Sequence, residues 1–245
     1  MYAGLAKIYD YLVAGVDFEA WIDYLEEILQ RFNYRPATVA DLACGTGNTL
    51  FPLARRGYKV TGIDISPQMV AVAAQKAGEA GLDVSFLIQD MRTFRLDAPV
   101  ELVTCFHDGL NYLLAYADLV QVFCRVRENL TTGGMFVFDL NALNWLADLP
   151  AEAGELKEQK ISLTWESKFD PRGPFWEICL KVSLDEENGV HRFAEVHREK
   201  GYRPEEVERA LAQAGLELLA AYDAFSFDPV HPGSRRHFYV AGRAF

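Results

Sequence analysis

The sequence predicts an α/β protein with a doubly wound parallel sheet and a small antiparallel β insertion. Helix and strand patterns alternate over the first 140 residues. The predicted strands are apolar almost throughout, which is typical of a parallel sheet covered on both faces. After residue 140 the pattern changes to a two-residue alternation, which indicates antiparallel strands. A length of 245 residues suits one large domain that carries such an insertion.

The parallel sheet is expected to contain five strands separated by helices. The strands are predicted at residues 38–42, 58–65, 84–89, 101–106 and 135–140. Helices are predicted at 17–33, at 48–56, at 117–130 and from Ser66 to Gly78 or Gly81. Apolar residues at helical spacing predict the first of them, with Asp17 as its N-cap. Ser66 and Pro67 are a cap residue and a proline at the first helical position, so they predict a helix start.

The insertion is expected over residues 145–200. Apolar and polar residues alternate at 161–169, 176–184 and, more loosely, 190–199. Turn residues join these segments at 170–174 and 187–189. Strands joined by such turns pair in antiparallel fashion.

The rest of the chain is expected to form the main domain, from residues 1–144 and 201–245. Its last part is predicted to contain a helix at 204–214 and two strands, at 216–225 and 236–244. These two strands would extend the main sheet after the chain has returned from the insertion.

Charge and composition exclude several kinds of partner. The chain has 35 acidic and 24 basic residues, a formal net charge of −11, which repels nucleic-acid phosphates and anionic lipids. No apolar run approaches the roughly 20 residues of a membrane span, and the N-terminus does not resemble a secretory signal. A cytoplasmic protein is therefore predicted. The 4 cysteines lie far apart without a C-x-x-C pair, which predicts buried reduced thiols and no metal site.

The turn after the first strand is the strongest sign of a ligand. Gly45 and Gly47 let the backbone pass close to a bound molecule, at the carboxyl end of a strand where open α/β sheets bind ligands. We expect a side chain at Gly47 to occupy space that the ligand needs. A tight turn that binds nothing is the alternative. A dinucleotide fingerprint requires a third glycine where Leu50 stands, and Asp41 suits a cationic or amine-bearing ligand better than a diphosphate.

Acidic residues also follow the next two strands. Asp64 can accept hydrogen bonds from both hydroxyls of a ribose, or it can interact with the N-terminus of the following helix. Asp90 can accept from the amino group of an adenine, and Met91 can lie on its ring. Three acids at three consecutive strand ends point together to a nucleoside.

These motifs resemble those of class I S-adenosylmethionine-dependent methyltransferases. The resemblance rests on segments 41–47 (DLACGTG), 62–69 (GIDISPQM), 89–91 (QDM) and 130–136 (LTTGGMF), with Ala43 where many members carry glycine. It implies a Rossmann-like seven-stranded sheet whose last strand runs antiparallel. It also implies S-adenosylmethionine as the cofactor. The residues it places at the cofactor are Tyr9, Trp21, Asp41, Ala43, Gly45, Gly47, Asp64, Ile65, Met69, Asp90, Met91 and Phe106.

The N-terminal region narrows the resemblance. Residues 2–12 and 18–21 are similar to the N-terminal helix of small-molecule N-methyltransferases, which include amino-sugar dimethyltransferases and glycine-methyltransferase-like enzymes. That helix covers the cofactor, hence the assignment of Tyr9 and Trp21, although core packing is an alternative for Trp21. In such enzymes this insertion forms a substrate lid or a subunit contact, so the chain could form a homodimer through it.

The segment after residue 106 is the expected acceptor side. His107 or Asp108 could serve as a general base, unless Asp108 caps the next helix and His107 is structural. Asn111 and Tyr112 are candidate substrate anchors, and His197 is a third from the insertion.

The predicted reaction is transfer of a methyl group to a small-molecule acceptor, an amine nitrogen, by in-line displacement. Enzymes that methylate nucleic-acid bases or glutamine amides typically carry an Asp/Asn-Pro-Pro-aromatic tetrapeptide at this strand end, where this chain has Cys105-Phe-His-Asp108. A protein that binds S-adenosylmethionine without catalysis and an NAD(P)-dependent oxidoreductase are the alternatives.

Overall fold

The main sheet of the computed structural model has seven strands in the order β10-β11-β5-β4-β1-β2-β3. The structure describes residues 4–158, 160–186 and 189–243. The strands are β1 (Thr38–Leu42), β2 (Lys59–Asp64), β3 (Ser85–Ile88), β4 (Val100–Cys105), β5 (Leu130–Asn141), β10 (Glu217–Asp223) and β11 (Arg236–Gly242). Strands β1 to β5 pair in parallel, and β11 runs antiparallel to both β5 and β10. The predicted doubly wound, Rossmann-like sheet with an antiparallel last strand is confirmed.

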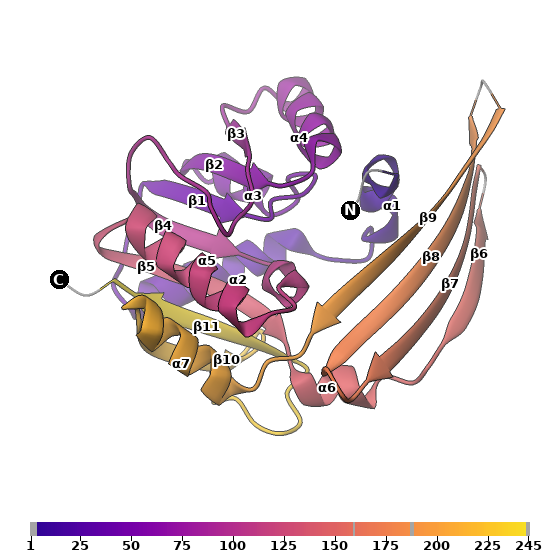
Figure 1. Ribbon diagram of the computed structural model, residues 1–245. Helices are drawn as coiled ribbons and strands as arrows, with labels where there is room; N and C mark the ends of the chain where they lie inside the picture. Colours follow the sequence, from indigo (N-terminus) through magenta and orange to yellow (C-terminus); the bar gives the residue numbers. More distant parts are fainter. Residues whose placement is uncertain (1–3, 159, 187–188, 244–245) are drawn as a thin grey trace.

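Helices cover both faces of this sheet (Figure 1). They are α2 (Phe18–Arg31), α3 (Leu50–Arg55), α4 (Pro67–Ala80), α5 (Tyr116–Asn129) and α7 (Pro204–Ala214). Short helical segments are η1 (Leu5–Lys7), α1 (Tyr9–Leu12), η2 (Gly109–Tyr112) and α6 (Leu143–Asp148). Helices α5 and α7 share one core cluster with one side of the strands, and α2, α3 and α4 share another with the opposite side. The alternating sides of each buried strand therefore both require apolar residues, which explains the continuous apolar runs.

Local signals place the helix ends. The Asp17 carboxylate accepts a hydrogen bond of 3.1 Å from the backbone N–H of Ala20. The Ser66 hydroxyl accepts one of 3.3 Å from Met69 N–H, and α4 ends at Gly81 in the left-handed conformation, with φ of +64°. The cap at Asp17, the start at Ser66 and the end at Gly81 all follow the prediction.

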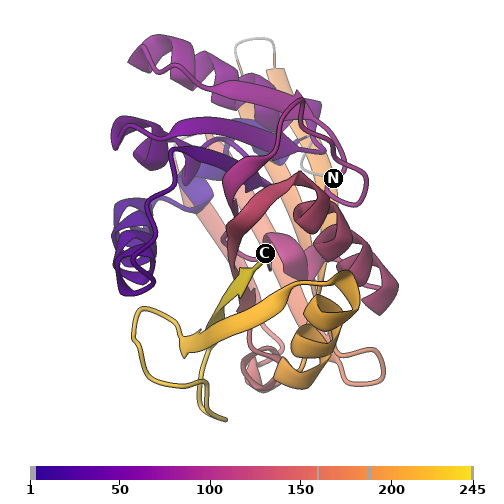
Figure 2. The ribbon, with the colours of Figure 1, turned by 90° about the vertical axis from the view of Figure 1, so that its left-hand side faces the viewer.

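The second sheet is antiparallel, in the order β6-β7-β8-β9. Its strands are β6 (Ala153–Glu158), β7 (Ile161–Asp170), β8 (Phe175–Glu186) and β9 (Gly189–Lys200). Figures 1 and 2 show it standing across from the main sheet, and Figure 1 shows α1 between β9 and the main sheet. The N-terminal residues Leu5 and Ile8 pack on apolar side chains of β7 and β8. The predicted antiparallel insertion after β5 is confirmed.

The cysteines depart in part from the prediction. All four are free, and Cys44 and Cys105 are buried, but Cys124 and Cys179 are only partly buried. Cys179 pairs with Glu166 and Val196 on the outer face of the small sheet, so the expectation of four buried thiols is wrong there.

In the described part of the chain, no helix is long and apolar enough to cross a membrane.

Candidate active site

A turn with three left-handed residues follows β1. Ala43, Gly45 and Gly47 have φ of +54°, +54° and +87°. A Cβ added at Gly47 would lie 2.4 Å from the ring of Phe51 in α3, so a side chain there meets the protein itself. A Cβ at Gly45 would meet nothing nearer than the Ala43 carbonyl oxygen at 4.0 Å. A side chain at Gly47 would therefore point at Phe51, and the open position of the turn is Gly45; the assignment of Gly47 to the cofactor stays a prediction.

Asp64 links this turn to the end of β2 by hydrogen bonds. Its Oδ2 accepts a hydrogen bond of 2.9 Å from Gly45 N–H, and its Oδ1 accepts one of 2.8 Å from Ser66 N–H. Each carboxylate oxygen has a second lone pair, so both can still accept from a ligand hydroxyl. The next side chain, Ile65, is 57% exposed although it follows a buried strand. An acid beside an exposed apolar side chain suits a nucleoside.

Asp90 follows β3 and forms a bidentate ion pair with Arg92, with a distance of 2.6 Å between Arg92 Nη2 and Asp90 Oδ2. Arg92 also pairs with Asp118 at 3.3 Å. The hydrogen bonds from the Arg92 side chain lower the pKa of Asp90, so this carboxylate is ionised. Met91 is partly buried against the core.

Asp41 lies inside the protein, 1% exposed. Its two oxygens accept hydrogen bonds of 2.7 Å each from the hydroxyls of Thr49 and Thr104. Burial raises the pKa of Asp41 to about 6. The side chain thus ties the glycine turn and β4 to β1, and its assignment to the cofactor stays a prediction.

The N-terminal segment lies over the glycine turn. Asp10 accepts hydrogen bonds from Thr46 Oγ1 at 2.5 Å, Asn48 Nδ2 at 2.9 Å and Lys76 Nζ at 2.6 Å. A cavity of about 30 Å³ remains beneath the segment. Its lining includes the predicted residues Tyr9, Ala43, Gly45, Phe106 and His107. At about 10–15 Å³ for one water molecule, a larger ligand here requires the segment to move.

His107 and Asp108 form a strained turn after β4, with φ of +58° and +70°. The buried Asp139 carboxylate accepts hydrogen bonds from His107 N–H at 2.7 Å and Asp108 N–H at 3.4 Å. Arg236 of β11 forms ion pairs with both Asp108 and Asp139. The His107 Nδ1 lies 3.3 Å from the Tyr9 hydroxyl. Burial lowers the pKa of His107, so its imidazole is neutral at pH 7.

One further prediction concerns this turn. Asp108 occupies the N-cap position of η2 but makes no capping hydrogen bond, so helix capping does not explain it. Sequence reasoning missed Asp139 and Arg236. An acid within the apolar run of β5 was the signal for Asp139, whereas nothing near Arg236 in the sequence marked it.

The end of the small sheet meets the end of β5. Glu199, which sequence reasoning missed, is 6% exposed and accepts a hydrogen bond of 3.0 Å from Asn141 Nδ2. Asn111 is fully buried, where it donates to the Lys200 carbonyl at 2.9 Å and accepts from Asn141 N–H at 3.0 Å. It therefore holds β9 against β5 and does not reach the cavity.

Four other predicted residues lie in packed surroundings. Tyr112 and His197 approach each other, with 3.3 Å between the hydroxyl and Nδ1. Trp21 is 5% exposed and packs on Phe106 and His107, so its core-packing alternative matches these contacts. Met69 is 2% exposed in α4 and does not line the cavity. The roles of these residues stay predictions.

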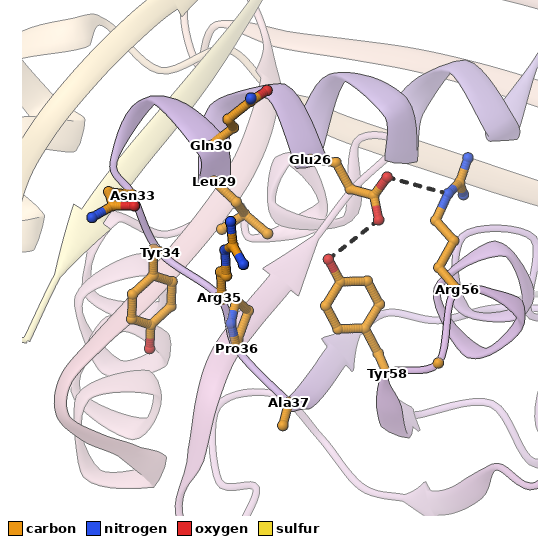
Figure 3. A pocket seen from close by; sticks show the side chains of 11 residues that line it. Glu26, Leu29, Gln30, Asn33, Tyr34, Arg35, Pro36, Ala37, Arg56 and Tyr58 are labelled. Carbon is orange, nitrogen blue, oxygen red and sulfur yellow. Dashed lines mark hydrogen bonds and ion pairs between the residues drawn. The ribbon is translucent and has the colours of Figure 1, made fainter.

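A larger cavity, of about 580 Å³, lies at the opposite edge of the sheet (Figure 3). Its lining comes from the end of α2 and from residues before β1 and β2. Glu26 spans it by contacts with Tyr58 and Arg56. Because open α/β sheets bind ligands at the carboxyl ends of their strands, we place the active site at the smaller cavity.

Comparisons with known proteins agree with the geometry at the carboxyl edge. Residues 39–134 match the family model of a methyltransferase domain. A solved S-adenosylmethionine-dependent methyltransferase from Clostridium acetobutylicum ATCC 824 is 28% identical, with a TM-score of 0.87 over 100% of this chain and 99% of that one. The chain is a class I S-adenosylmethionine-dependent methyltransferase. The match extends over the small sheet as well as the main one.

Two sequence relatives of this methyltransferase cover most of its length. A protein of Geobacillus sp. strain WCH70, named provisionally as a methyltransferase, is 29% identical over 98% of both chains. The dTDP-3-amino-3,6-dideoxy-α-D-glucopyranose N,N-dimethyltransferase of Streptomyces fradiae is 27% identical over 89% of this chain and 86% of its own.

The residues at the edge of the sheet fit the cofactor S-adenosylmethionine. Asp64 can accept from ribose hydroxyls, and the exposed Ile65 and partly buried Met91 offer apolar contacts to adenine. Gly45, which has open space where a Cβ would lie and donates to Asp64, lines the small cavity together with Tyr9 and His107. The assignment of His107 to the acceptor side stays a prediction.

Proposed function

We propose that the methyltransferase acts on the nitrogen of a small-molecule amine. The observation that carries this proposal is the acid-rich wall around His107. Asp108, Asp139 and Glu199 meet there and are opposed by Arg236. With Glu199 uncharged, the carboxylates of Asp108 and Asp139 still face a single guanidinium, and this balance attracts an ammonium group and repels a carboxylate or phosphate acceptor.

The names of relatives support an amino sugar as the first acceptor to test. Enzymes of Streptomyces fradiae, Streptomyces venezuelae and Saccharopolyspora spinosa, 27%, 25% and 24% identical, are N,N-dimethyltransferases of dTDP-linked amino sugars. Each is matched over at least 84% of its own length. We extend that acceptor class to this chain as a hypothesis, and the net charge of −11 argues against a nucleic acid.

S-adenosylmethionine supplies an electrophilic methyl group when bound. The chain must then hold the nitrogen in line and exclude water, and such positioning can lower a barrier by about 7–11 kcal/mol. The neutral His107 imidazole, held by Tyr9, is proposed to contact the acceptor nitrogen, with Asp108 supplying negative charge beside it. Tyr112 and His197 are proposed to line the outer part of the acceptor site.

We propose that the small sheet is a lid on this side. Its apolar face packs on Leu5 and Ile8 of the same chain. Glu199 and the backbone of Lys200 contact the end of the main sheet through Asn141 and Asn111. These contacts within one chain favour a lid over a subunit contact for this face.

A methyl-transfer assay tests the proposed function. The purified enzyme would be incubated with S-adenosylmethionine and paired acceptors that differ only in an amine or a hydroxyl, starting with dTDP-3-amino-3,6-dideoxy-α-D-glucopyranose. Release of S-adenosylhomocysteine with the amines alone is expected. Transfer to hydroxyl partners, or to none of the amines, would contradict the proposal.

A further inference from the structure

The small sheet contributes one acidic side chain to the acceptor side. Glu199 lies near the end of β9, where it pairs with Trp176 of β8. It is almost completely buried, and its Oε2 accepts the hydrogen bond of 3.0 Å from Asn141 at the end of β5. The carboxyl group is thus fixed where the small sheet meets the carboxyl edge of the main sheet.

Acidic groups outnumber basic groups around Glu199. The groups that face it from the main domain, the N-terminal segment and its own strand are Asp108, Asp139, Arg236, Tyr9, Glu195 and His197. Arg236 is shared between Asp108 and Asp139. Burial, with Asp108 as the next cause, raises the pKa of Glu199 to about 8, so it holds a proton at pH 7. A positive charge placed beside it would release that proton.

We propose that Glu199 binds the ammonium group of the acceptor and takes its proton, an inference that rests on the proposed amine methylation. Binding of the ammonium group first releases the Glu199 proton to solvent. The N–H bond then breaks as an O–H bond forms on the Glu199 carboxylate, the nitrogen keeps the electron pair, and this second proton later passes to solvent. Asp108 is ion-paired with Arg236, which it shares with Asp139. Among the described residues, only Asn141 donates a hydrogen bond to Glu199, which leaves Oε1 for the acceptor.

Glu199→Gln separates this role from a structural one. Glutamine keeps an oxygen for Asn141 but cannot take a proton, so a purely structural Glu199 predicts an unchanged enzyme. We expect kcat/KM for dTDP-3-amino-3,6-dideoxy-α-D-glucopyranose to fall by about a hundredfold, with S-adenosylmethionine affinity within about twofold. Glu177→Gln is the matched control, because Glu177 pairs with Arg198 and Lys168 on the outer face of the same sheet. It should behave as wild type.

The pH profile gives a second readout. One proton must be shared between Glu199 and the amine, so kcat/KM of the wild-type enzyme should be bell-shaped. Glu199→Gln can use only the neutral amine, and its profile should show a single rising limb. A bell that persists in the variant would overturn the proposal.

Binding can be tested without turnover. The carboxyl signals of protein labelled with [5-¹³C]glutamate would be recorded during titration with cyclohexylammonium chloride, and the signal missing in Glu199→Gln would identify Glu199. This signal is expected to shift with cyclohexylammonium and not with cyclohexanol. An unshifted signal overturns the ammonium site even if amines are methylated. A shifted signal in an enzyme that methylates no amine overturns the proposed function alone.

Discussion

The carboxylate of Asp64 accepts a hydrogen bond from the backbone N–H of Gly45 across 2.9 Å. This contact joins the ends of the neighbouring strands β1 and β2 at the one position of the glycine turn that has open space beside it. The acid therefore has two tasks, because it orients the turn and can also receive ribose hydroxyls.

Asp64→Asn should weaken cofactor binding. The amide that replaces one oxygen cannot accept from Gly45 or Ser66 N–H, and hydrogen bonds to charged groups contribute about 1.5–3 kcal/mol each. We expect the Kd for S-adenosylmethionine to rise by about tenfold or more in a calorimetric titration. Asp83→Asn, an exposed acid before β3, is the control. Equal affinities for the two variants would count against the assignment of Asp64.

The two glycines of the turn should respond differently to alanine. Gly47→Ala places a Cβ 2.4 Å from Phe51, so overpacking should cost about 1–3 kcal/mol of unfolding free energy. Gly45→Ala meets no such contact and should cost about 1–2 kcal/mol for its left-handed backbone. Urea unfolding measures both, and Phe51→Leu should recover part of the loss in Gly47→Ala alone. Recovery in both variants, or in neither, would contradict this account.

These glycines show what the sequence could and could not predict. The G-T-G pattern placed the turn correctly, because a tight turn depends on neighbouring residues. Which glycine has open space beside it depends on Phe51, whose position is set by the packing of α3. Strand β6 was missed because half of its residues are charged and it is held by pairing with β7.

The acidic wall was harder to predict. Asp139 and Arg236 lie 97 residues apart in the chain and meet only because β11 inserts antiparallel beside β5. Glu199 lies near them because the end of β9 in the small sheet meets the end of β5 in the main sheet. Short-range motifs therefore predicted the cofactor side, whereas the acceptor side depends on contacts between distant segments.

Asp41 should make stability depend on pH. Burial raises its folded-state pKa from 3.8 to about 6, so the folded protein holds this proton more tightly than the unfolded chain. The contribution to stability is fully present below pH ~4 and is lost as the pH rises to about 6, a change of about 3 kcal/mol. Asp41→Asn should remove this part of the slope in urea unfolding at pH 4.5, 5.5 and 6.5. A slope equal to that of the wild type would refute the shift.

The hydrogen bonds of Asp10 should control access to the cofactor site. They tie the N-terminal segment to Thr46, Asn48 and Lys76 above a cavity of about 30 Å³, so binding requires this segment to open. Asp10→Ala removes all three contacts, and each side-chain hydrogen bond contributes about 1 kcal/mol.

The open state of the segment should therefore be more populated in Asp10→Ala, and both association and dissociation of S-adenosylmethionine should be faster. Stopped-flow fluorescence can measure both rates, because Trp21 packs on His107 beneath the segment. Asp17→Ala is a suitable control, since it affects the start of α2 without touching the glycine turn. If only dissociation accelerates, Asp10 stabilises the bound state and does not gate entry, because a gate must change both rates in the same direction.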